Sequence, residues 1–316
     1  MRVNPQIRRW LTGRKSDPSI RFRFLTEVEG KNPTNAGVRK AKEAIGQTGW
    51  ASWLLGFQHP DGHWVTPGTS TRELMRPRFL STFWIANVLA DLGMERSDPR
   101  ICKTAELILG LQEQVLADPG SDHCIGANLT RTLIQFGYLD HSVVQRSLEW
   151  LIQTQKSDGG WHCFPSHSGT LDCWEGLAAF AAIPEDSRDD ATRRALERNA
   201  EFYLKRGLMK EGNGRYAPWF RIHFPNYYHY DLLVGLRLLT RLGYAADPRL
   251  RPALRWLRSK RRPDGTWALD AVHPDEEFGN FTWPQVMIPV MFESLHERSQ
   301  WATVGALSVL ARVDST

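Results

Sequence analysis

Three stretches of the chain, "FQHPDGHW" (Phe57–Trp64), "TQKSDGGW" (Thr154–Trp161) and "KRRPDGTW" (Lys260–Trp267), share the pattern Asp-Gly-x-Trp. Each follows an apolar segment with helical spacing, and an Asp-Gly pair is typical of a tight turn. The three tryptophans lie 97 and 106 positions apart. A fixed spacing of this kind indicates that one structural unit repeats along the chain.

A second recurring pattern ends one helix and opens the next. It occurs at 89–101 ("LADLGMERSDPRI"), 134–144 ("IQFGYLDHSVV") and 239–257 ("LTRLGYAADPRLRPALRWL"). Gly just past a helix supplies the left-handed C-cap, and Asp before Pro favours a new helix start. Alternating strand patterns are nearly absent. The sequence therefore predicts an all-α fold, an α/α toroid of about five to six helical hairpins.

The apolar periodicity divides the expected helices into two rings. Inner helices are expected at Phe79–Leu92, Ala127–Phe136, Thr170–Ala182, Tyr228–Leu242 and Pro284–His296. Outer helices are expected at Val38–Gly56, Arg100–Gln114, Ser142–Gln155, Asp190–Arg206 and Arg249–Arg258, with Gln300–Arg312 closing the chain. No change of composition marks a second domain, so residues 36–316 are expected to form one toroid.

The composition of the 316 residues is that of a globular protein, with 41% apolar and 24% charged residues. No run reaches the roughly 18 apolar residues of a membrane span, and no signal peptide is recognisable. Four cysteines in a chain of this length are more typical of thiols or metal ligands in a reducing compartment than of a disulfide scaffold. The sequence predicts a cytoplasmic protein that carries no nucleic-acid-binding module.

Residues 1–35 are expected to form a basic N-terminal arm, since the first 24 residues hold seven Arg and Lys and one acid. The simpler interpretation is a solvated arm packed across the outside of the barrel. The alternative is peripheral contact with an anionic membrane, because Ile7, Trp10, Leu11 and Phe22 alternate with the arginines.

The pattern Gln-x-x-Asp-Gly-x-Trp at Gln58–Trp64 and Gln155–Trp161 resembles the QW motif of squalene and oxidosqualene cyclases; the third copy has Arg261 in place of Gln. The resemblance extends in pattern over roughly 36–313 and includes the protein prenyltransferase β subunits. It implies an α/α toroid whose QW residues tie helix ends together, and an isoprenoid or terpenoid as a hydrophobic small-molecule substrate. The Asp-x-Asp-Asp acid of class II cyclases is missing, because Asp186, Asp189 and Asp190 have another spacing and fit a helix cap.

The prenyltransferase resemblance also implies zinc. In that family a glycine–aromatic turn leads to an Asp and a Cys that bind zinc together with a later His; Asp172, Cys173 and His229 match these positions. The family separates its Asp and Cys by one residue, whereas here they are adjacent. Adjacent helical residues point about 100° apart, so the match is weaker for Asp172.

In such a toroid the loops that enter the inner helices meet at one rim, where the polar candidates gather. The candidate zinc ligands are Cys124, Cys163, His167, Cys173 and His229, since thiolate and imidazole are the donors that zinc selects. The candidate catalytic groups are Asp172, Glu175, His229 and Asp231. The candidate substrate-binding aromatics are Trp84, Trp174, Trp219, Tyr227, Tyr228 and Trp283.

Each candidate also has a structural interpretation. A Cys beside a Trp often only packs in the core, and an acid at a helix start often only caps it. The function predicted from the rim is that of a terpene cyclase-like or prenyltransferase-like enzyme, with zinc as the candidate cofactor. The alternative is a toroid without catalysis that binds lipid or serves as a scaffold. A glycan-active toroid is a third interpretation, although no motif in the sequence supports it.

Overall fold

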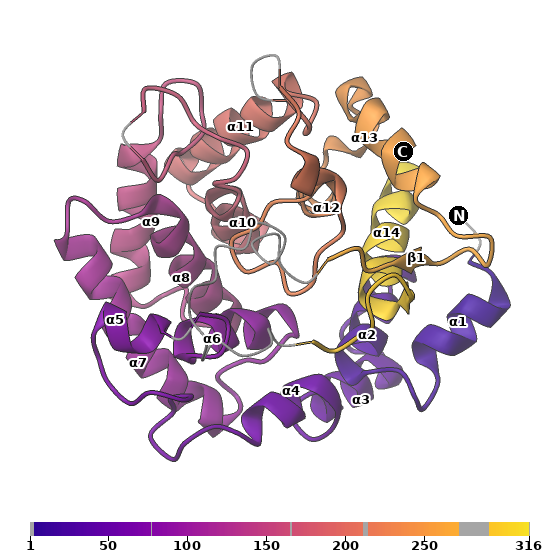
Figure 1. Ribbon diagram of the computed structural model, residues 1–316, viewed down its shortest axis with the longest axis horizontal. Coiled ribbons are helices and arrows are strands. Elements are labelled where there is room, and N and C mark those ends of the chain that lie inside the picture. Colours follow the sequence, from indigo (N-terminus) through magenta and orange to yellow (C-terminus); the bar gives the residue numbers. More distant parts are fainter. Residues whose placement is uncertain (1–2, 77, 165, 211–213, 272–290, 316) are drawn as a thin grey trace.

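The computed structural model describes residues 3–76, 78–164, 166–210, 214–271 and 291–315. Its helices form two concentric layers, as Figure 1 shows. The inner helices are α6 (Thr82–Asp91), α8 (His123–Phe136), α10 (Glu175–Ala182), α12 (Leu232–Arg241) and α14 (Gln300–Val313). The outer helices are α3 (Ala36–Ala44), α4 (Gly49–Leu55), α7 (Pro99–Ala117), α9 (Ser142–Thr154), α11 (Asp190–Lys205) and α13 (Arg251–Ser259). The prediction of an all-α toroid is confirmed.

Burial explains why the two layers differ in composition. Helices α6, α10 and α14 bury side chains on every face, whereas α9, α11 and α13 bury one face and expose charged residues on the other. A helix enclosed by a second ring must be apolar around its circumference. The helix Gln300–Arg312, which we expected among the outer helices, is therefore inner: its residues from Trp301 to Leu310 are all buried.

Successive inner helices pack side by side, α6 on α8, α8 on α10, α10 on α12 and α12 on α14. The N-terminal residues complete the circle through α1 (Pro5–Thr12), α2 (Pro18–Arg23) and the π-helix η1 (Phe24–Val28). Helix α2 packs on both α14 and α3, and Ile20 and Phe24 belong to the main core. Ile7 and Leu11 of α1 are also buried in this core.

Two predicted helices have different bounds in the structure. The stretch Val38–Gly56 is two helices, because Gly49 adopts a left-handed φ of +80° and the Trp50 N–H donates to the carboxylate of Asp17 over 2.7 Å. Of the expected helix Pro284–His296, residues 284–290 lie outside the described residues and residues 291–296 are not helical. Asp17 is thus a structural acid that fastens the N-terminal region to α4.

The three Asp-Gly-x-Trp turns share one geometry. Each indole N–H donates to the carbonyl ten residues earlier: Trp64 to Leu54 at 2.9 Å, Trp161 to Leu151 at 3.0 Å and Trp267 to Leu257 at 2.8 Å. The glycines have φ of +97°, +92° and +84°, a region that favours residues without a Cβ. The turn therefore folds back onto the C-terminal end of the outer helix that precedes it.

The glutamine of the first two copies connects each turn to the next outer helix. Gln58 donates to the Arg100 carbonyl of α7 and Gln155 to the Ala195 carbonyl of α11, both at 2.9 Å. In the third copy Arg261 instead donates to the Gly265 carbonyl within its own turn, at 3.3 Å. The glutamines of the first two copies consequently link each turn to the next outer helix, whereas Arg261 of the third copy bonds to its own turn.

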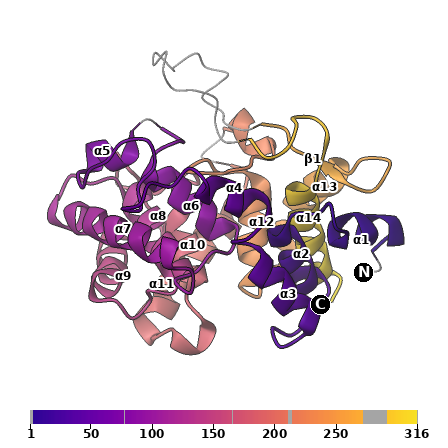
Figure 2. The same ribbon diagram turned by 90° about the horizontal axis from the view of Figure 1, so that it is seen from below.

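The remaining elements lie toward the rims. They are α5 (Thr71–Met75), the 3-10 helices η2 (Glu185–Ser187), η3 (Ala217–Phe220), η4 (Tyr244–Ala246) and η5 (Pro248–Leu250), and the antiparallel strands β1 (Trp267–Ala268) and β2 (Arg298–Ser299). Figure 2 places α5 and β1 on one side of the ring and the end of α14 on the other. None of the helices in the described parts of the chain has the length and apolarity to cross a membrane.

Candidate functional site

A cavity of about 1220 Å³ opens on the side of the ring that carries α5. Its wall combines the starts of α6 and α8 with the segments that lead into α10 and α12, and α5 and η3 border it. The lining includes Arg72, Arg76, Arg78, Phe83, Trp84, Asp122, Cys124, Cys163, Asp172, Cys173, Arg215, Trp219, Tyr228 and His229. Segments from five distant parts of the chain therefore meet at one cavity.

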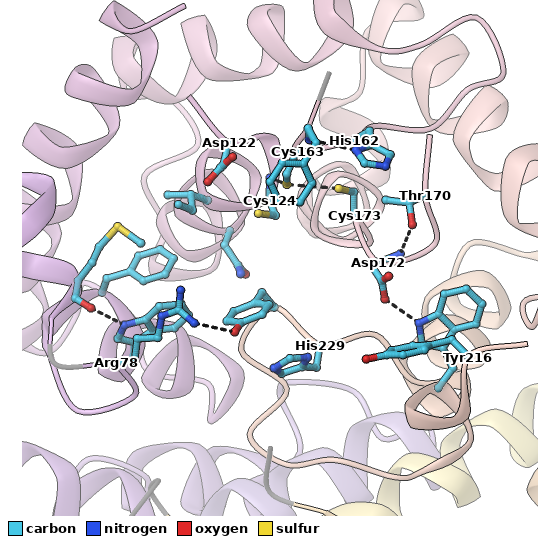
Figure 3. Close-up of a pocket in the computed structure, with 18 of the residues that line it drawn as sticks. Arg78, Asp122, Cys124, His162, Cys163, Thr170, Asp172, Cys173, Tyr216 and His229 are labelled. Carbon is cyan, nitrogen blue, oxygen red and sulfur yellow. Dashed lines mark hydrogen bonds between the residues drawn. The ribbon is translucent and has the colours of Figure 1, made fainter. Parts of the chain in front are cut away.

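Three of the four cysteines meet in the wall of this cavity (Figure 3). The Sγ atoms of Cys163 and Cys173 are 3.5 Å apart, and the backbone N–H of Cys124 donates to Cys163 Sγ over 3.3 Å. The fourth cysteine, Cys102, lies apart on outer helix α7, where its thiol donates to the Arg96 carbonyl. The topology thus gathers thiols from the start of α8, the loop after Trp161 and the segment before α10.

The thiols of this cluster are electrostatically unequal. Hydrogen bonds from the thiols of Cys124 and Cys173 lower the pKa of Cys163. The same hydrogen bonding, together with burial, raises the pKa of Cys173 and of Cys124. These opposite shifts in pKa favour Cys163 over its two neighbours as the thiol that loses its proton.

Glu175 lies directly behind the thiols, at the first position of α10. The residue is fully buried, and no other residue in the described part of the chain hydrogen-bonds to either of its carboxyl oxygens. Burial, followed by the negative charge of Cys163, raises its pKa well above the usual value. It does not line the cavity, so a ligand in the cavity would meet the thiols before it met Glu175.

The carboxyl group of Asp172 faces the cavity and accepts a short hydrogen bond. Its Oδ1 accepts a 2.6 Å hydrogen bond from the indole N–H of Trp219. The residue precedes Cys173 in a segment without helix. This contact joins η3 to the entrance of α10 and orients both residues on one wall.

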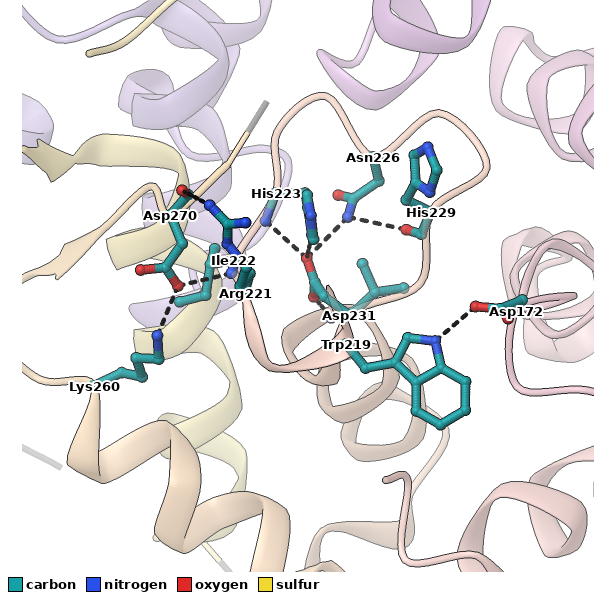
Figure 4. Close-up of polar contacts among 11 residues, drawn as sticks. Asp172, Trp219, Arg221, Ile222, His223, Asn226, His229, Asp231, Lys260 and Asp270 are labelled. Carbon is teal, nitrogen blue, oxygen red and sulfur yellow. Dashed lines mark hydrogen bonds and ion pairs between the residues drawn. The ribbon is translucent and has the colours of Figure 1, made fainter. Parts of the chain in front are cut away.

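Asp231, another predicted catalytic acid, has a structural position instead. It is fully buried, caps α12 by accepting the Val234 N–H, and accepts hydrogen bonds from the His223 N–H at 2.9 Å and the Asn226 side chain at 3.0 Å (Figure 4). It is not part of the cavity wall. Asp231 holds together the loop that carries Tyr228 and His229.

An acid that we did not count among the catalytic candidates, Asp122, does line the cavity. It is the N-cap residue of α8, yet its side chain makes no capping hydrogen bond. Burial, followed by the charge of Cys163, raises its pKa. In the sequence Asp122 resembles an ordinary helix cap before His123 and Cys124, and only its missing cap contact distinguishes it.

The predicted aromatics divide into two groups. Trp84, Trp219 and Tyr228 line the cavity, and the Trp84 and Tyr228 ring centroids lie 5.6 Å apart. Trp174 and Tyr227 are buried behind the wall, where Trp174 lies under the Arg131 guanidinium at 5.3 Å. Trp283 lies outside the described residues. Phe83 and Phe164 extend the aromatic lining.

The zinc ligands that the resemblance implies are not assembled around one point. His167 is exposed and outside the cavity lining, while the His229 ring packs on Tyr228 with 4.2 Å between centroids. Within the described ranges, no three His, Cys, Asp or Glu residues form a group that could hold a metal ion. Because the residues present do not fit the implied ligand set, no chemical step below is assigned to zinc.

Four arginines, Arg72, Arg76, Arg78 and Arg215, border the opening and are exposed. The Arg78 guanidinium donates to the Tyr228 hydroxyl at 3.3 Å. Three of these arginines stand within seven residues of the sequence around α5. They place positive charge at the entrance to a wall that is otherwise aromatic and thiol-rich.

Solved structures with similar coordinates include three different proteins. A variant of the type II terpene cyclase MstE from Scytonema in complex with geranylgeranyl dihydroxybenzoate has 17% sequence identity and a TM-score of 0.46, covering 94% of this chain and 87% of its own. A protein from Actinoplanes has 16% identity and a TM-score of 0.44, with 98% of both chains covered. A polysaccharide lyase has 13% identity and a TM-score of 0.46, covering 96% of this chain and 93% of its own.

The chain matches no protein-family model, and no curated protein matches it. Because one fold can host many activities, the residues of the cavity decide what this chain can do.

Proposed function

We propose that this chain is an isoprenoid-processing enzyme of the terpene cyclase or prenyltransferase type, which holds a hydrophobic chain with an anionic end group. The observation that carries the proposal is a cavity of about 1220 Å³ with aromatic walls and four arginines at its opening. Small-molecule sites typically measure about 300–1000 Å³, so this cavity can accommodate a long flexible ligand. Its chemistry suits a molecule that is apolar along its length and charged at one end.

The aromatic wall supports reactions that pass through carbocations. The rings of Phe83 and Tyr228 both lie against Trp84, with centroid distances of 4.5 Å and 5.6 Å. Ring faces attract a desolvated cation by about 2 kcal/mol or more each. A cationic carbon that develops on a bound isoprenoid would therefore be stabilised at this wall without a counter-ion.

Asp122 is the proposed general acid. Its carboxyl group lines the cavity, and burial raises its pKa, so it holds a proton at a higher pH than an exposed aspartate. Protonation of a substrate double bond by Asp122 would leave an aspartate and a carbocation facing the aromatic wall. Asp172 and the arginines are assigned to substrate orientation, because Asp172 is engaged by Trp219.

Zinc remains a separate proposal that follows from the resemblance and from the thiols. Metal analysis of protein purified without a His tag, compared with the double variant Cys163→Ser and Cys173→Ser, tests it directly. Stoichiometric zinc in the parent protein and its loss in the variant would support zinc dependence. Zinc far below stoichiometry in the parent protein would end that proposal and leave the acid chemistry of Asp122 unaffected.

The test of the main proposal compares a charged and a neutral ligand of equal chain length. Farnesyl diphosphate should bind at least tenfold more tightly than farnesol at low salt, and the difference should shrink as salt screens the arginines. Products of added prenyl substrates are then sought by mass spectrometry with the parent protein and with Asp122→Asn. Asp140→Asn, in the exposed turn between α8 and α9, is the matched control.

The outcomes distinguish an enzyme from a protein that only binds lipid. Turnover that is lost in Asp122→Asn and kept in Asp140→Asn supports the enzyme. Tight binding of the diphosphate, or a co-purified lipid, without any turnover favours the alternative of a lipid-binding toroid, which the missing Asp-x-Asp-Asp motif supports. If neither ligand binds, the isoprenoid proposal is wrong.

A further inference from the structure

The thiol cluster has a geometry that suits a reversible covalent reaction. Cys163 and Cys173 are in direct sulfur–sulfur contact at 3.5 Å, and both line the open cavity. A disulfide bond is about 2.05 Å long, so the two sulfurs would have to approach by about 1.5 Å. Neither residue belongs to a helix or strand, and an approach of this size would break no helical hydrogen bond.

Two further features favour a reaction between Cys163 and Cys173: the cavity gives a solute access to them, and Cys102 lies too far away to compete. Cys163 is half-buried, and a small solute can reach it through the cavity. The third thiol, Cys124, belongs to α8, and its backbone N–H already contacts Cys163 Sγ at 3.3 Å. Cys102 on α7 is remote from the cavity lining and cannot take part.

We propose that Cys163 and Cys173 are a redox-active pair that a peroxide oxidises to a reversible disulfide within the cavity wall. This inference goes beyond the proposed isoprenoid chemistry and holds whether or not the chain is an enzyme. An external dithiol can re-open the bond by thiol–disulfide exchange and is itself oxidised to a disulfide.

The reaction balances with hydrogen peroxide as the oxidant. The sulfur of Cys163 attacks one peroxide oxygen, the O–O bond breaks, and a sulfenic acid forms while the departing hydroxide takes up the thiol proton as water. The sulfur of Cys173 then attacks the sulfenic sulfur, the S–O bond breaks, and the departing hydroxide leaves as water with the Cys173 proton. Two thiols lose two electrons in total, and one peroxide yields two waters.

Access assigns the order of the two steps. Cys163 is half-buried in the cavity wall, so a peroxide in the cavity meets its sulfur first. Cys173 is buried, and its sulfur reacts second, with the sulfenic acid that has formed 3.5 Å away. The disulfide would covalently join the two ends of the segment 164–172. This segment carries the exposed ring of Phe164 and the carboxyl group of Asp172.

The experiment oxidises the full-length reduced chain with graded hydrogen peroxide in the presence of a chelator. Remaining thiols are then alkylated, and the peptides are mapped by mass spectrometry. Of the four thiols, two should be lost together, and one cross-linked peptide pair should contain Cys163 and Cys173. Dithiothreitol should restore both thiols.

Single-cysteine variants test which thiols form the cross-link. Cys163→Ser and Cys173→Ser should each abolish the cross-link, whereas the matched control Cys102→Ser should form it to the same extent as the parent chain. A parent protein in which both residues stay alkylatable, or accumulate sulfinic acid without a cross-link, would overturn the proposal. A dominant Cys124–Cys163 cross-link would overturn it as well. Because these readouts come from the parent protein, a variant that fails to fold does not remove the test.

Discussion

The indole N–H of Trp219 donates a 2.6 Å hydrogen bond to the carboxyl group of Asp172, and so joins η3 to the entrance of α10. Trp219 is only 2% exposed, whereas Asp172 is exposed at the cavity, so water can replace the carboxyl group as acceptor when that side chain is removed. This contact fixes the wall of the cavity between the thiols and η3. It also accounts for Asp172, which the sequence suggested as a zinc ligand or an acid.

Asp172→Ala should therefore lower the free energy of unfolding by about 1 kcal/mol, the net contribution of a typical hydrogen bond. Urea denaturation followed by tryptophan fluorescence measures the change. The exposed Asp186→Ala in η2 should stay within about 0.5 kcal/mol of the parent protein. Equal stability of the two variants would show that the Trp219–Asp172 bond contributes nothing to the fold.

Two helical glycines should respond oppositely to alanine. A Cβ at Gly176 of α10 would lie 2.6 Å from the Trp161 ring, whereas a Cβ at Gly110 of α7 would meet no atom within 4 Å. Gly176→Ala should destabilise by about 1–3 kcal/mol through overpacking. Gly110→Ala should stabilise by up to about 1 kcal/mol through helix propensity. Thermal melts measure both, and a stabilising Gly176→Ala would contradict the close packing of α10 on the second Asp-Gly-x-Trp turn.

Glu175 should make the stability of the protein depend on pH. Burial raises its pKa in the folded state above that of the unfolded chain, so the folded state binds the proton more tightly. The resulting stability is complete below the unfolded pKa and is lost as the pH rises through the folded pKa. Urea titrations over a pH series should show this loss for the parent protein.

Glu175→Gln should remove that loss, because the amide cannot ionise. The exposed Glu149→Gln on α9 is the matched control and should keep the slope of the parent protein. A parent-like pH profile in Glu175→Gln would show that another group is responsible.

The arginines at the opening should contribute to ligand affinity rather than to stability. Arg72→Gln should weaken farnesyl diphosphate binding about tenfold to a hundredfold, since a hydrogen bond to a charged group contributes about 1.5–3 kcal/mol. Farnesol binding should not change. Calorimetry at low and moderate salt measures both ligands, with Arg146→Gln on the exposed face of α9 as the control. An equal loss for both ligands would place Arg72 outside the anionic subsite.

The sequence predicted the helical repeat well because its signals are local. Asp98 before Pro99 and the left-handed Gly137 stand at helix ends as expected. The Asp-Gly-x-Trp turns were recognisable for the same reason. The prediction was wrong for Gln300–Arg312, whose inner position depends on what surrounds it, and for Val38–Gly56, where an acid more than thirty residues away meets the helix break.

The candidate site was less predictable, since contacts between distant segments define it. We expected Cys124, Cys163 and Cys173 to lie close together because they occupy equivalent positions in the repeat. The structure brings the three together. The different positions of the three acids could not be predicted from the repeat. Asp122 faces the cavity, Glu175 lies behind the thiols and Asp231 caps a helix. All three stand near helix starts, and the sequence offers no measure of which way each side chain turns.

The amino-acid sequence alone determined the all-α repeat and the side of the ring on which its polar loops gather, because caps, turns and apolar periodicity act over a few residues. The tertiary structure decided which thiols touch, which carboxyl groups lose water, and which rings face the cavity. Those properties depend on packing between segments up to 150 positions apart, such as Arg78 and Tyr228, and burial changes the proton affinity of a side chain only after that packing is complete.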